Sequence, residues 1–568
     1  MSEFVIALSI VFVTAGVLLL VANQFGFPPV PFYIIAGLIA GGFVEQAALV
    51  DLALWGVAFL VFVFGIRIDL SDLKSVLRDG EAAAFIQLMV VAPIAFGIGY
   101  GLGSQFGFED PFRNALYFSA AATLSSTLVG MQEFRSQIRN NLVHGRLAKS
   151  IHLFDDIVAI GALLVFSAEV LTDAQVVTSK IGYGVLFLLA GMLLYRHGFP
   201  LLERAAGGDD ELVLMGSISI LIAFIAAAEA VEISIVVGAF AAGLAVRTER
   251  AESINVRNGI QSIRDFFVAI FFVTIGALVS VPTIEVLAFA GVLVALVVAF
   301  NPFIHALAFV TEGYDGRTAF LAGSSLNQVS ELALVIAIQA LLLETIADAL
   351  FDAIVLAAAI TMILSSIAGR YEHAFYDAVL SRILVGRTRY IDEHSDVEDG
   401  LEDHVVVVGY GRKGRRIVRL FEELDVPYVV VENDPTVRDD LVSTCRNYVF
   451  GDVMAPYPRE LARIDAARLV ISTANHRPLS EALLDLETDG DVILRADNSQ
   501  EAEELLDAGA TFVSVPSVLA SDQLVENVER VLADVREAEP LQAEHREFLE
   551  TIEWFGLERQ LDEPRERA

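Results

Sequence analysis

Apolar stretches long enough to cross a membrane recur along the first two thirds of the chain. They return roughly every 25 to 30 residues, and short polar segments separate them. A helix needs about 20 apolar residues to cross the hydrocarbon layer. We therefore predict a polytopic α-helical membrane protein with thirteen spans, near residues 4–22, 30–45, 48–66, 82–104, 112–130, 146–168, 180–197, 211–229, 233–247, 260–280, 285–309, 318–342 and 349–370.

The charges between the spans test this number independently. With thirteen spans, every arginine-rich loop falls on one side of the membrane, and the loops on the other side are acidic. Basic loops face the cytoplasm. We predict a multi-pass protein of the plasma membrane, with its N-terminus outside and its C-terminal part in the cytoplasm. The basic residues concerned are Arg67, Lys74, Arg78, Arg135, Arg139, Arg146, Arg196, Arg204, Arg247, Arg250, Arg257, Arg317, Arg370, Arg382, Arg387 and Arg389.

Two adjacent carboxylates, Asp155 and Asp156, lie in the middle of the sixth apolar run. Low dielectric and mutual repulsion both disfavour having the two groups ionised at once. Such a pair persists where protons or a metal cation neutralise it, and an ionisable residue inside a membrane indicates a functional site. The alternative is a buried ion pair for one aspartate and a helix end for the other.

The fifth and twelfth spans contain polar runs that predict interrupted helices. The fifth reads Ser-Ala-Ala-Ala-Thr-Leu-Ser-Ser-Thr at 119–127, and the twelfth reads Gly-Ser-Ser-Leu-Asn-Gln-Val-Ser-Glu at 323–331. Membranes tolerate unwound backbone only beside a cavity or within protein. Seven spans separate the two, so a repeat relating them must be inverted, which indicates a transporter site near the midplane. Packing of small residues is the alternative for Ser125, Ser126 and Thr127.

Other polar residues inside the spans have less definite roles. Glu331 is either a third titratable site or a partner for polar backbone at the break. Asn327 is more simply structural than a ligand, and His152 is a packed polar residue or a modulator of Asp156. Asn301-Pro302 indicates a kink in the eleventh span.

After residue 390 the pattern changes to short apolar runs that alternate with amphipathic segments. A buried strand leads into Gly409, Gly411 and Gly414 in the spacing G-x-G-x-x-G, and a helix follows. A second strand, 428–431, ends in Glu432, where an acidic side chain binds a ribose 2′-hydroxyl. Further strands at 448–450, 469–472, 492–495 and 512–515 predict a doubly wound parallel sheet.

We therefore predict a Rossmann-like nucleotide-binding domain of α/β class. Glu432 disfavours a 2′-phosphate, so the expected regulatory ligand is NAD(H) or AMP rather than NADP. The alternative is an apo fold used for association alone. The candidate binding residues are Gly409, Tyr410, Gly411, Arg412, Lys413, Gly414, Arg415, Glu432, Asn433, Asp434 and Asp452.

Charge and composition restrict the setting further. The formal net charge is −35, and lysine is rare, with only Lys74, Lys149, Lys180 and Lys413. Such acidity suits a cytoplasm of high salt, where screening weakens repulsion, and we infer a halophilic source. It also argues against a nucleic-acid partner. The single cysteine, Cys445, excludes a disulfide framework and a cysteine metal site.

Together these motifs resemble a known family over roughly residues 4–520. The acidic pair, the broken spans, the Phe-Phe-Val-Thr-Ile-Gly run at 271–276 and Gln-Val-Ser-Glu at 328–331 resemble the second monovalent cation:proton antiporter family. The C-terminal part resembles the TrkA-N (RCK) nucleotide-binding module, and the combination resembles Kef-type potassium:proton antiporters. The resemblance implies a homodimer in the bilayer, and it implies that Asp155 and Asp156 take cation and proton alternately.

Two positions depart from the family pattern. Kef-type proteins typically have Gln-Asp at the acidic site, whereas Asp155-Asp156 is the form that sodium-transporting relatives often have. Many relatives also have a lysine in the eleventh span, where this chain has Asn301. The charge stoichiometry therefore does not follow from the resemblance.

We predict a K⁺ or Na⁺:proton antiporter, a secondary transporter and not an enzyme. Its parts are an exchanger domain at 1–385, a linker at 386–402, an RCK domain at 403–538 and an acidic tail at 539–568. Ser125, Ser126, Thr127, Asn327 and Glu331 would support the Asp155-Asp156 site, with no redox cofactor and no structural metal. The alternatives are an RCK-gated potassium channel or uptake component, which would need a carbonyl filter motif, and a membrane NAD-dependent oxidoreductase.

Overall fold

The computed structural model of the protein describes residues 2–43, 46–67, 81–166, 174–207, 209–246, 254–380, 391, 394–398, 400–486, 488, 490–533 and 540–546. Two compact units make up the chain, Met1–Arg387 and Thr388–Ala568. The predicted loop charges at Lys74, Arg78, Arg247, Arg250, Arg382, Arg387 and Arg389, about half of the linker and most of the acidic tail lie outside the described residues. The finer domain boundaries stay a prediction.

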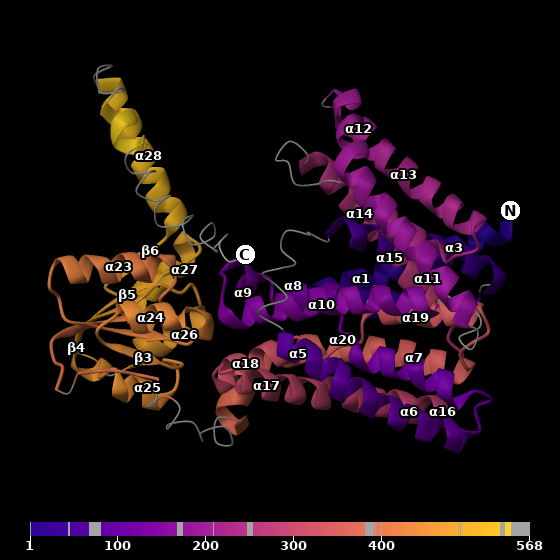
Figure 1. The fold of residues 1–568 in the computed structure, drawn as a ribbon, viewed down its shortest axis with the longest axis horizontal. Helices are drawn as coiled ribbons and strands as arrows, with labels where there is room; N and C mark the ends of the chain where they lie inside the picture. The colour runs from indigo at the N-terminus through magenta and orange to yellow at the C-terminus, as the bar shows by residue number, and fades with distance from the viewer. Residues whose placement is uncertain are drawn as a thin grey trace, which may run out of the picture. The chain divides into compact units, whose positions relative to one another are not determined.

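Helices occupy the positions of the predicted spans in the first unit (Figure 1). Among the described residues, five helical stretches are long and apolar enough to cross a membrane by length and composition: Ala83–Phe106, Thr178–Ala206, Asp210–Ala230, Ile284–Thr311 and Asp348–Leu380. The number of crossings therefore stays a prediction. The helices are α1 (Ser2–Phe25), α2 (Pro29–Gly41), α3 (Gln46–Arg67), α5 (Glu81–Ile86), α6 (Ala92–Phe106), α7 (Pro111–Thr123), α8 (Thr127–Glu133), α9 (Arg135–Arg139), α10 (Val143–Phe166), α11 (Ala174–Leu193), α12 (Phe199–Ala206), α13 (Asp210–Ala230), α14 (Ile235–Leu244), α15 (Ile254–Leu278), α16 (Ile284–Ala295), α17 (Asn301–Thr311), α18 (Gly316–Ser324), α19 (Glu331–Leu342) and α20 (Asp348–Phe375).

Short π-helical turns join several of these helices into longer ones. They are η1 (Gln87–Val91), η2 (Leu194–Gly198) and η4 (Leu296–Phe300), and a further π turn, η5 (Tyr376–Leu380), continues α20. The turn η4 directly precedes Asn301 and Pro302, so the irregularity predicted in the eleventh span is a π turn that ends at the proline. A π turn adds a residue to one turn of helix and often lies at a functional site.

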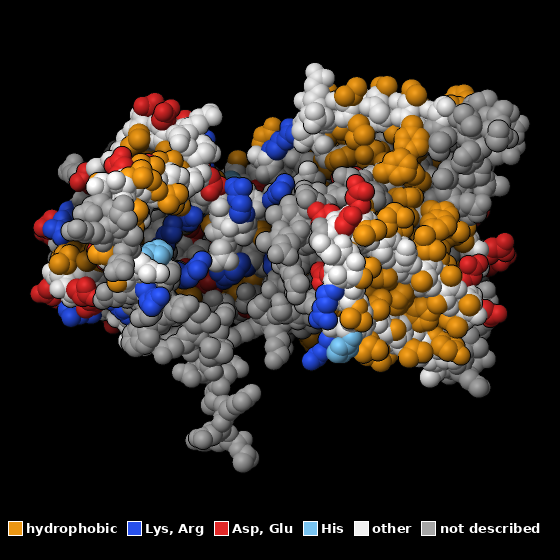
Figure 2. All heavy atoms as spheres, turned by 90° about the horizontal axis from the view of Figure 1, so that it is seen from above, with side chains coloured by type: hydrophobic (Ala, Val, Ile, Leu, Met, Phe, Trp, Pro, Cys, Tyr) orange, Lys and Arg blue, Asp and Glu red, His pale blue; other side chains and the backbone are white. Residues whose placement is uncertain are grey.

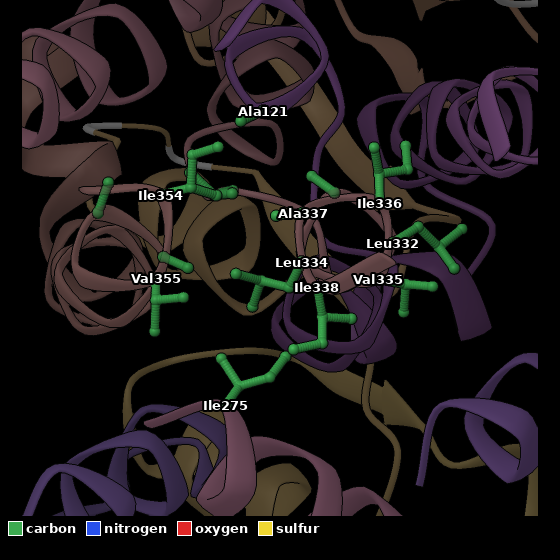
Figure 3. Packing of buried hydrophobic residues seen from close by; sticks show 14 of the residues in the cluster. Ala121, Ile275, Leu332, Leu334, Val335, Ile336, Ala337, Ile338, Ile354 and Val355 are labelled. Atoms are coloured by element: carbon green, nitrogen blue, oxygen red, sulfur yellow. The ribbon is translucent and has the colours of Figure 1, made fainter. Parts of the chain in front are cut away.

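The largest hydrophobic core of this unit surrounds α19, which is apolar on all sides. Leu332, Leu334, Val335 and Ile338 are almost fully buried, and they pack with α20 and α15 (Figure 3). A helix that is apolar all round is stable only when other helices enclose it. On the outside of the unit, hydrophobic side chains cover a broad face, as expected for a surface in contact with lipid (Figure 2).

Close glycine contacts join α15 to α2 and α14 to α3. A methyl group on Gly276 of α15 would lie 2.1 Å from the backbone oxygen of Ile34 on α2. A methyl group on Gly243 of α14 would lie 2.1 Å from the backbone oxygen of Phe62 on α3. Small residues allow helix backbones to approach closely in membranes, so these four helices form one tightly packed group.

We expect Gly276→Ala to destabilise the protein, because the methyl group forces α2 and α15 apart. Overpacking of this kind costs about 1–3 kcal/mol. The measurement is thermal unfolding of the purified protein in detergent. Gly161→Ala on α10 is the matched control, since no atom lies within 4 Å of the position of its methyl group. Equal melting curves for the two variants would contradict the packing argument.

The second unit is built on a six-stranded parallel sheet with the order β3-β2-β1-β4-β5-β6, which confirms the predicted doubly wound fold (Figure 1). The predicted strands are all present within a few residues of their predicted bounds. The strands are β1 (His404–Val408), β2 (Tyr428–Glu432), β3 (Tyr448–Phe450), β4 (Ala467–Ser472), β5 (Asp491–Arg495) and β6 (Phe512–Ser514). The helices are α23 (Arg412–Glu423), α24 (Arg438–Thr444), α25 (Pro456–Leu461), α26 (Arg477–Leu484), α27 (Ser499–Asp507) and α28 (Pro516–Ala533).

Candidate functional site

The two interrupted helices cross each other at their breaks. The helix α7 ends at Thr123 and α8 begins at Thr127, while α18 ends at Ser324 and α19 begins at Glu331. Ser125 forms an antiparallel bridge with Val329. The Ser330 backbone N–H donates to the Leu124 backbone oxygen at 3.1 Å. The interruptions predicted at 119–127 and 323–331 are thus present, over shorter stretches than predicted.

Serine side chains begin the second half of each broken helix. The Ser126 hydroxyl accepts from the Val129 backbone N–H at 3.3 Å, and the Ser330 hydroxyl accepts from the Leu332 backbone N–H at 3.0 Å. A serine in this position satisfies a helix N–H that has no partner in its own helix. Four half-helix ends therefore meet at the crossing, and each of these two N–H groups has a hydrogen-bond acceptor.

Asp155 of α10 lies against this crossing and is buried. Its Oδ2 accepts from the Ser125 backbone N–H at 2.9 Å and from the Ser125 hydroxyl, and its Oδ1 accepts from the Gln87 side-chain amide. Three donors therefore hold this carboxylate in one orientation. Hydrogen bonds of this kind favour the ionised form, whereas burial opposes it.

Asp156 is also buried and bonds to the start of α8. Its Oδ1 accepts from the Thr127 hydroxyl at 2.8 Å. Glu331, the first residue of α19, accepts from the Leu128 backbone N–H at 2.9 Å, and it interacts electrostatically with Asp155. This contact shows the second of the two roles considered for Glu331, that of a partner for polar backbone at the break. Its role as a third titratable site stays a prediction.

Two residues that the motifs missed connect to Asp155. Gln87 donates to the Thr123 backbone oxygen at 2.7 Å as well as to Asp155, and the His305 Nε2 lies 3.4 Å from the Gln87 Oε1. Both residues are buried. A single glutamine in an otherwise apolar span was the available signal, but the π turn η1 that begins at Gln87 cannot be read from sequence.

Asn301 stands where the family resemblance implies a lysine, and its amide bonds to α7. The Asn301 Nδ2 donates to the Ala122 backbone oxygen at 2.6 Å, in the last turn before the break. The last carbonyls of a helix have no partner of their own and attract positive groups. Asn301 thus supplies a neutral donor where a lysine would supply a charged one.

The remaining predicted residues of this site are His152 and Asn327. The His152 Nδ1 lies 3.2 Å from the Ser125 hydroxyl, so this ring contacts the partner of Asp155. Asn327 lies in the α18–α19 break, and its buried Oδ1 has no hydrogen-bond partner among the described residues. No group of three or more His, Cys, Asp and Glu side chains is placed to hold a metal ion in the described part of the chain.

In the second unit, the three glycines of G-x-G-x-x-G have different roles. Gly409 has a φ of +95°, and a methyl group on it would lie 2.6 Å from the Thr473 hydroxyl. A methyl group on Gly414 would lie 2.0 Å from the Gly409 backbone oxygen, so this glycine allows α23 to pack on β1. Beside Gly411 there is open space within 4 Å, at the N-terminus of α23. A helix N-terminus with room beside its backbone suits a phosphate group.

Glu432 is engaged with backbone rather than exposed to a ligand. Its two oxygens accept from the Tyr410 N–H at 2.5 Å, the Asn433 N–H at 2.8 Å and the Asp434 N–H at 2.9 Å. Burial, followed by the nearby charge of Asp434, raises the pKa of Glu432. The carboxylate therefore holds the glycine loop to the end of β2, and its contact with a ribose stays a prediction.

The basic residues of the loop divide into two kinds. Arg415 forms an ion pair with Asp440 at 3.0 Å and lies over the Tyr410 ring. Arg412 and Lys413 are exposed residues, but the amine of Lys413 is partly enclosed. This partial desolvation, followed by the charges of Arg495 and Arg412, lowers the pKa of Lys413. These like charges gather at the open side of the loop, where an anion would stabilise them.

The other predicted binding residues form turns. The Asp434 side chain accepts from the Thr436 N–H at 3.0 Å, and Asp452 accepts from the Met454 N–H at 2.9 Å. The Tyr410 side chain is buried in the core between α23 and the sheet. These side chains shape the loops around the glycines, and their contacts with a nucleotide stay a prediction.

Comparison with known proteins gives matches to both units. The family model described as sodium/hydrogen exchanger, transmembrane, matches residues 8–370, and the model described as TrkA-N domain matches residues 405–516. A protein named "Putative K(+) efflux antiporter KefB" from Alkalimonas amylolytica is 27% identical over 524 residues, which cover 86% of this chain and 75% of the relative.

Two further matches come from Escherichia coli. A protein of strain K12 named "Putative cation/proton antiporter YbaL" is 26% identical over 536 residues, which cover 88% of this chain and 93% of the relative. The crystal structure of the TrkA-N domain of inner membrane protein YbaL is 24% identical, covers 22% of this chain and 97% of that one, and has a TM-score of 0.22.

Proposed function

The chain belongs to the sodium/hydrogen exchanger family, and we propose that it exchanges a monovalent cation for protons at Asp155 and Asp156. The observation that carries this proposal is the placement of two buried carboxylates against the crossing of two broken helices. Broken helices at mid-membrane are the usual place of ion sites in secondary transporters. The relatives named above are described as antiporters of K⁺ or of cations.

Exchange follows from competition for the same charge. A cation binds an ionised carboxylate, and a proton on that carboxylate removes the charge that attracts the cation. Asp155 is held by Gln87 and Ser125, whereas Asp156 receives a hydroxyl donor from Thr127. We assign alternate binding of cation and proton to Asp156 and positioning of the pair to Asp155. The unpartnered Oδ1 of Asn327 is a candidate oxygen ligand for the cation.

The transport cycle requires the site to open to each side in turn. We propose that thirteen spans, related in part by an inverted repeat, carry α7–α8 and α18–α19 as equivalent elements. The breaks are joined by one β-bridge and few backbone bonds, so they can shift without unfolding a long helix. A homodimer would anchor the tightly packed helices while the crossing moves.

The transported ion is K⁺ or Na⁺. The TrkA-N domain and the name of one relative favour K⁺. The Asp155-Asp156 pair and an acidic, lysine-poor composition favour Na⁺, because a saline habitat demands its export. The cytoplasmic TrkA-N domain would regulate exchange by binding NAD(H) or AMP, with the pyrophosphate or phosphate beside Gly411 and the positive charges of Arg412 and Lys413.

We expect the apparent cation affinity to fall as pH falls, because one site binds both ions. If one proton competes with one cation, the half-saturating cation concentration rises by up to about tenfold per pH unit once protons occupy the site. The measurement is proton flux in proteoliposomes across a pH series, with added NaCl or KCl. Protein-free liposomes control for leak. The salt that drives flux identifies the ion, and an affinity that is independent of pH throughout the active range would argue for separate pathways.

A further inference from the structure

Glu133, the last residue of α8, is a carboxylate that the proposed exchange site does not use. Its Oε2 accepts from the Ser365 hydroxyl at 2.7 Å, and its Oε1 accepts from the Ser366 hydroxyl at 2.8 Å. Both serines belong to α20. Both of these donors are neutral hydroxyl groups, and neither bond is an ion pair with a basic side chain.

The Ser365 hydroxyl also reaches Gln328, in the break between α18 and α19. The Ser365 Oγ lies 3.0 Å from the Gln328 Oε1. The Gln328 Nε2 donates to the Ser126 backbone oxygen at 3.2 Å and to the Ser325 backbone oxygen at 2.9 Å. Because both of these partners are acceptors, the amide orientation is determined, and the Gln328 oxygen must face Ser365. Gln328 therefore joins the two broken helices.

The donors and acceptors along this path show that Glu133 and the Gln328 oxygen compete for one hydrogen bond from Ser365. Ser365 has one hydroxyl proton and two acceptors, Glu133 and Gln328. When Glu133 is ionised, it accepts the hydrogen bond from the Ser365 hydroxyl. The Gln328 oxygen then has no donor from Ser365. When Glu133 binds a proton on Oε2, its O–H donates to the Ser365 Oγ, and the serine donates to Gln328. Only the protonated form satisfies every group in the path.

We propose that Glu133 is a second proton-binding group, which transmits cytoplasmic pH to the crossing of the broken helices through Ser365 and Gln328. The proposal rests on the proposed function, since the crossing is the exchange site. The proton comes from solvent and returns to it, and no covalent bond changes. Glu133 lies on the cytoplasmic side because α20, which carries both serines, leads into the cytoplasmic TrkA-N domain.

The helices packed against α8 include α9, α10 and α20. Glu372 of α20 interacts electrostatically with Glu133 and accepts from the Ser324 hydroxyl at 2.9 Å. A second nearby carboxylate makes it harder for both to be ionised. The neighbouring elements α9 and α10 carry Arg135, Arg139, His144, Arg146 and Lys149.

The two serines offer a matched pair of variants for a test. Ser365→Ala breaks the path from Glu133 to Gln328. Ser366→Ala removes an equal hydroxyl from the other oxygen of Glu133, and the second partner of Ser366 is the Met362 backbone oxygen rather than Gln328. Glu133→Gln keeps the shape of the side chain and provides an amide N–H in place of the acid proton, so it mimics the protonated form at every pH.

The experiment is the maximal exchange rate in everted vesicles, in which the cytoplasmic face meets the bath. The full-length protein is used at saturating cation, so that competition at the aspartate pair does not contribute, and the bath pH is varied. We expect Ser366→Ala to keep the titration of the maximal rate seen in the wild type, displaced toward higher pH, because the ionised Glu133 loses one hydroxyl donor. We expect Glu133→Gln and Ser365→Ala to lose the titration of the maximal rate with pH. The variant that carries both substitutions should behave like either single variant.

Three outcomes would overturn the proposal. The first is a wild-type titration in Glu133→Gln. The second is a wild-type titration in Ser365→Ala, and the third is the same loss in Ser366→Ala as in Ser365→Ala. A wild type without any cation-dependent proton flux would instead refute the proposed function, and with it this inference. Size-exclusion profiles of all variants confirm that each one is folded.

Discussion

Replacing Asp156 by asparagine should abolish cation-dependent proton exchange while the protein remains folded and inserted. Asparagine has the shape of the aspartate and keeps an oxygen that can accept from the Thr127 hydroxyl, which now lies 2.8 Å from the Asp156 Oδ1. It can neither carry a negative charge nor release a proton at physiological pH. Because both halves of the exchange need the same ionisable group, neither ion can be carried. The measurement is proton flux in proteoliposomes with added NaCl and KCl.

Two further aspartate variants provide a comparison and a control for Asp156→Asn. Asp155→Asn should weaken exchange or alter its stoichiometry, because the amide nitrogen must face either Gln87 or Ser125, and both of these groups are already donors. Asp352→Asn is the matched control. Asp352 is a buried carboxylate of α20 that accepts from the Ser280 backbone N–H at 3.3 Å, away from the crossing. Its variant should exchange ions like the wild type. Normal flux from Asp156→Asn would remove Asp156 from the site.

Gly411→Val should abolish the response of exchange to nucleotide and weaken nucleotide binding by more than tenfold. The side chain enters the open space beside the backbone at the start of α23, where a phosphate group would approach. The rate of exchange should change without being lost, because the proposed ion site lies in the other unit, and a ligand acts only by biasing conformations that already exist. Titration of the full-length protein with NADH, NADPH and AMP measures the binding.

The local geometry separates loss of binding from loss of folding. No atom lies within 4 Å of a methyl group on Gly411, and its φ of −71° suits any residue, so Gly411→Ala and Gly411→Val should fold normally. Gly414→Ala should instead destabilise this unit, because its methyl group would lie 2.0 Å from the Gly409 oxygen. Unchanged nucleotide affinity in Gly411→Val would place the ligand elsewhere, and a preference for NADPH would refute the ribose role of Glu432.

The features that could be predicted from the sequence are those that residues close together in the chain determine. Runs of serine, threonine and asparagine compete with helical hydrogen bonds, and both predicted interruptions are present at Leu124–Ser126 and Ser325–Ser330. The alternation of apolar runs with glycine-rich turns predicted the parallel sheet, and strand β3 (Tyr448–Phe450) has the predicted bounds.

The features that sequence could not supply are long-range. Gln87 contacts Asp155 because a π turn and helix packing bring together residues 68 positions apart. Nothing local to Gln328 indicates that its amide joins the two breaks, or that it shares a hydroxyl with Glu133. The G-x-G-x-x-G motif indicates a ligand for Glu432, yet one of its oxygens accepts from Tyr410 of this loop and the other accepts from the two residues that follow Glu432. Such contacts depend on the packed chain rather than on spacing.

The neutral amide of Asn301 has an electrical consequence for transport. Because this residue adds no positive charge beside α7, the charge of the carrier at the aspartate pair is the sum of two carboxylates and the ions bound to them. A pair holding one cation carries one negative charge, and the pair carries none if Asp155 binds a second proton besides the one assigned to Asp156. The step that moves the cation outward then carries negative charge outward. An inside-negative membrane voltage favours that step, by about 2.3 kcal/mol per 100 mV if the full voltage is crossed.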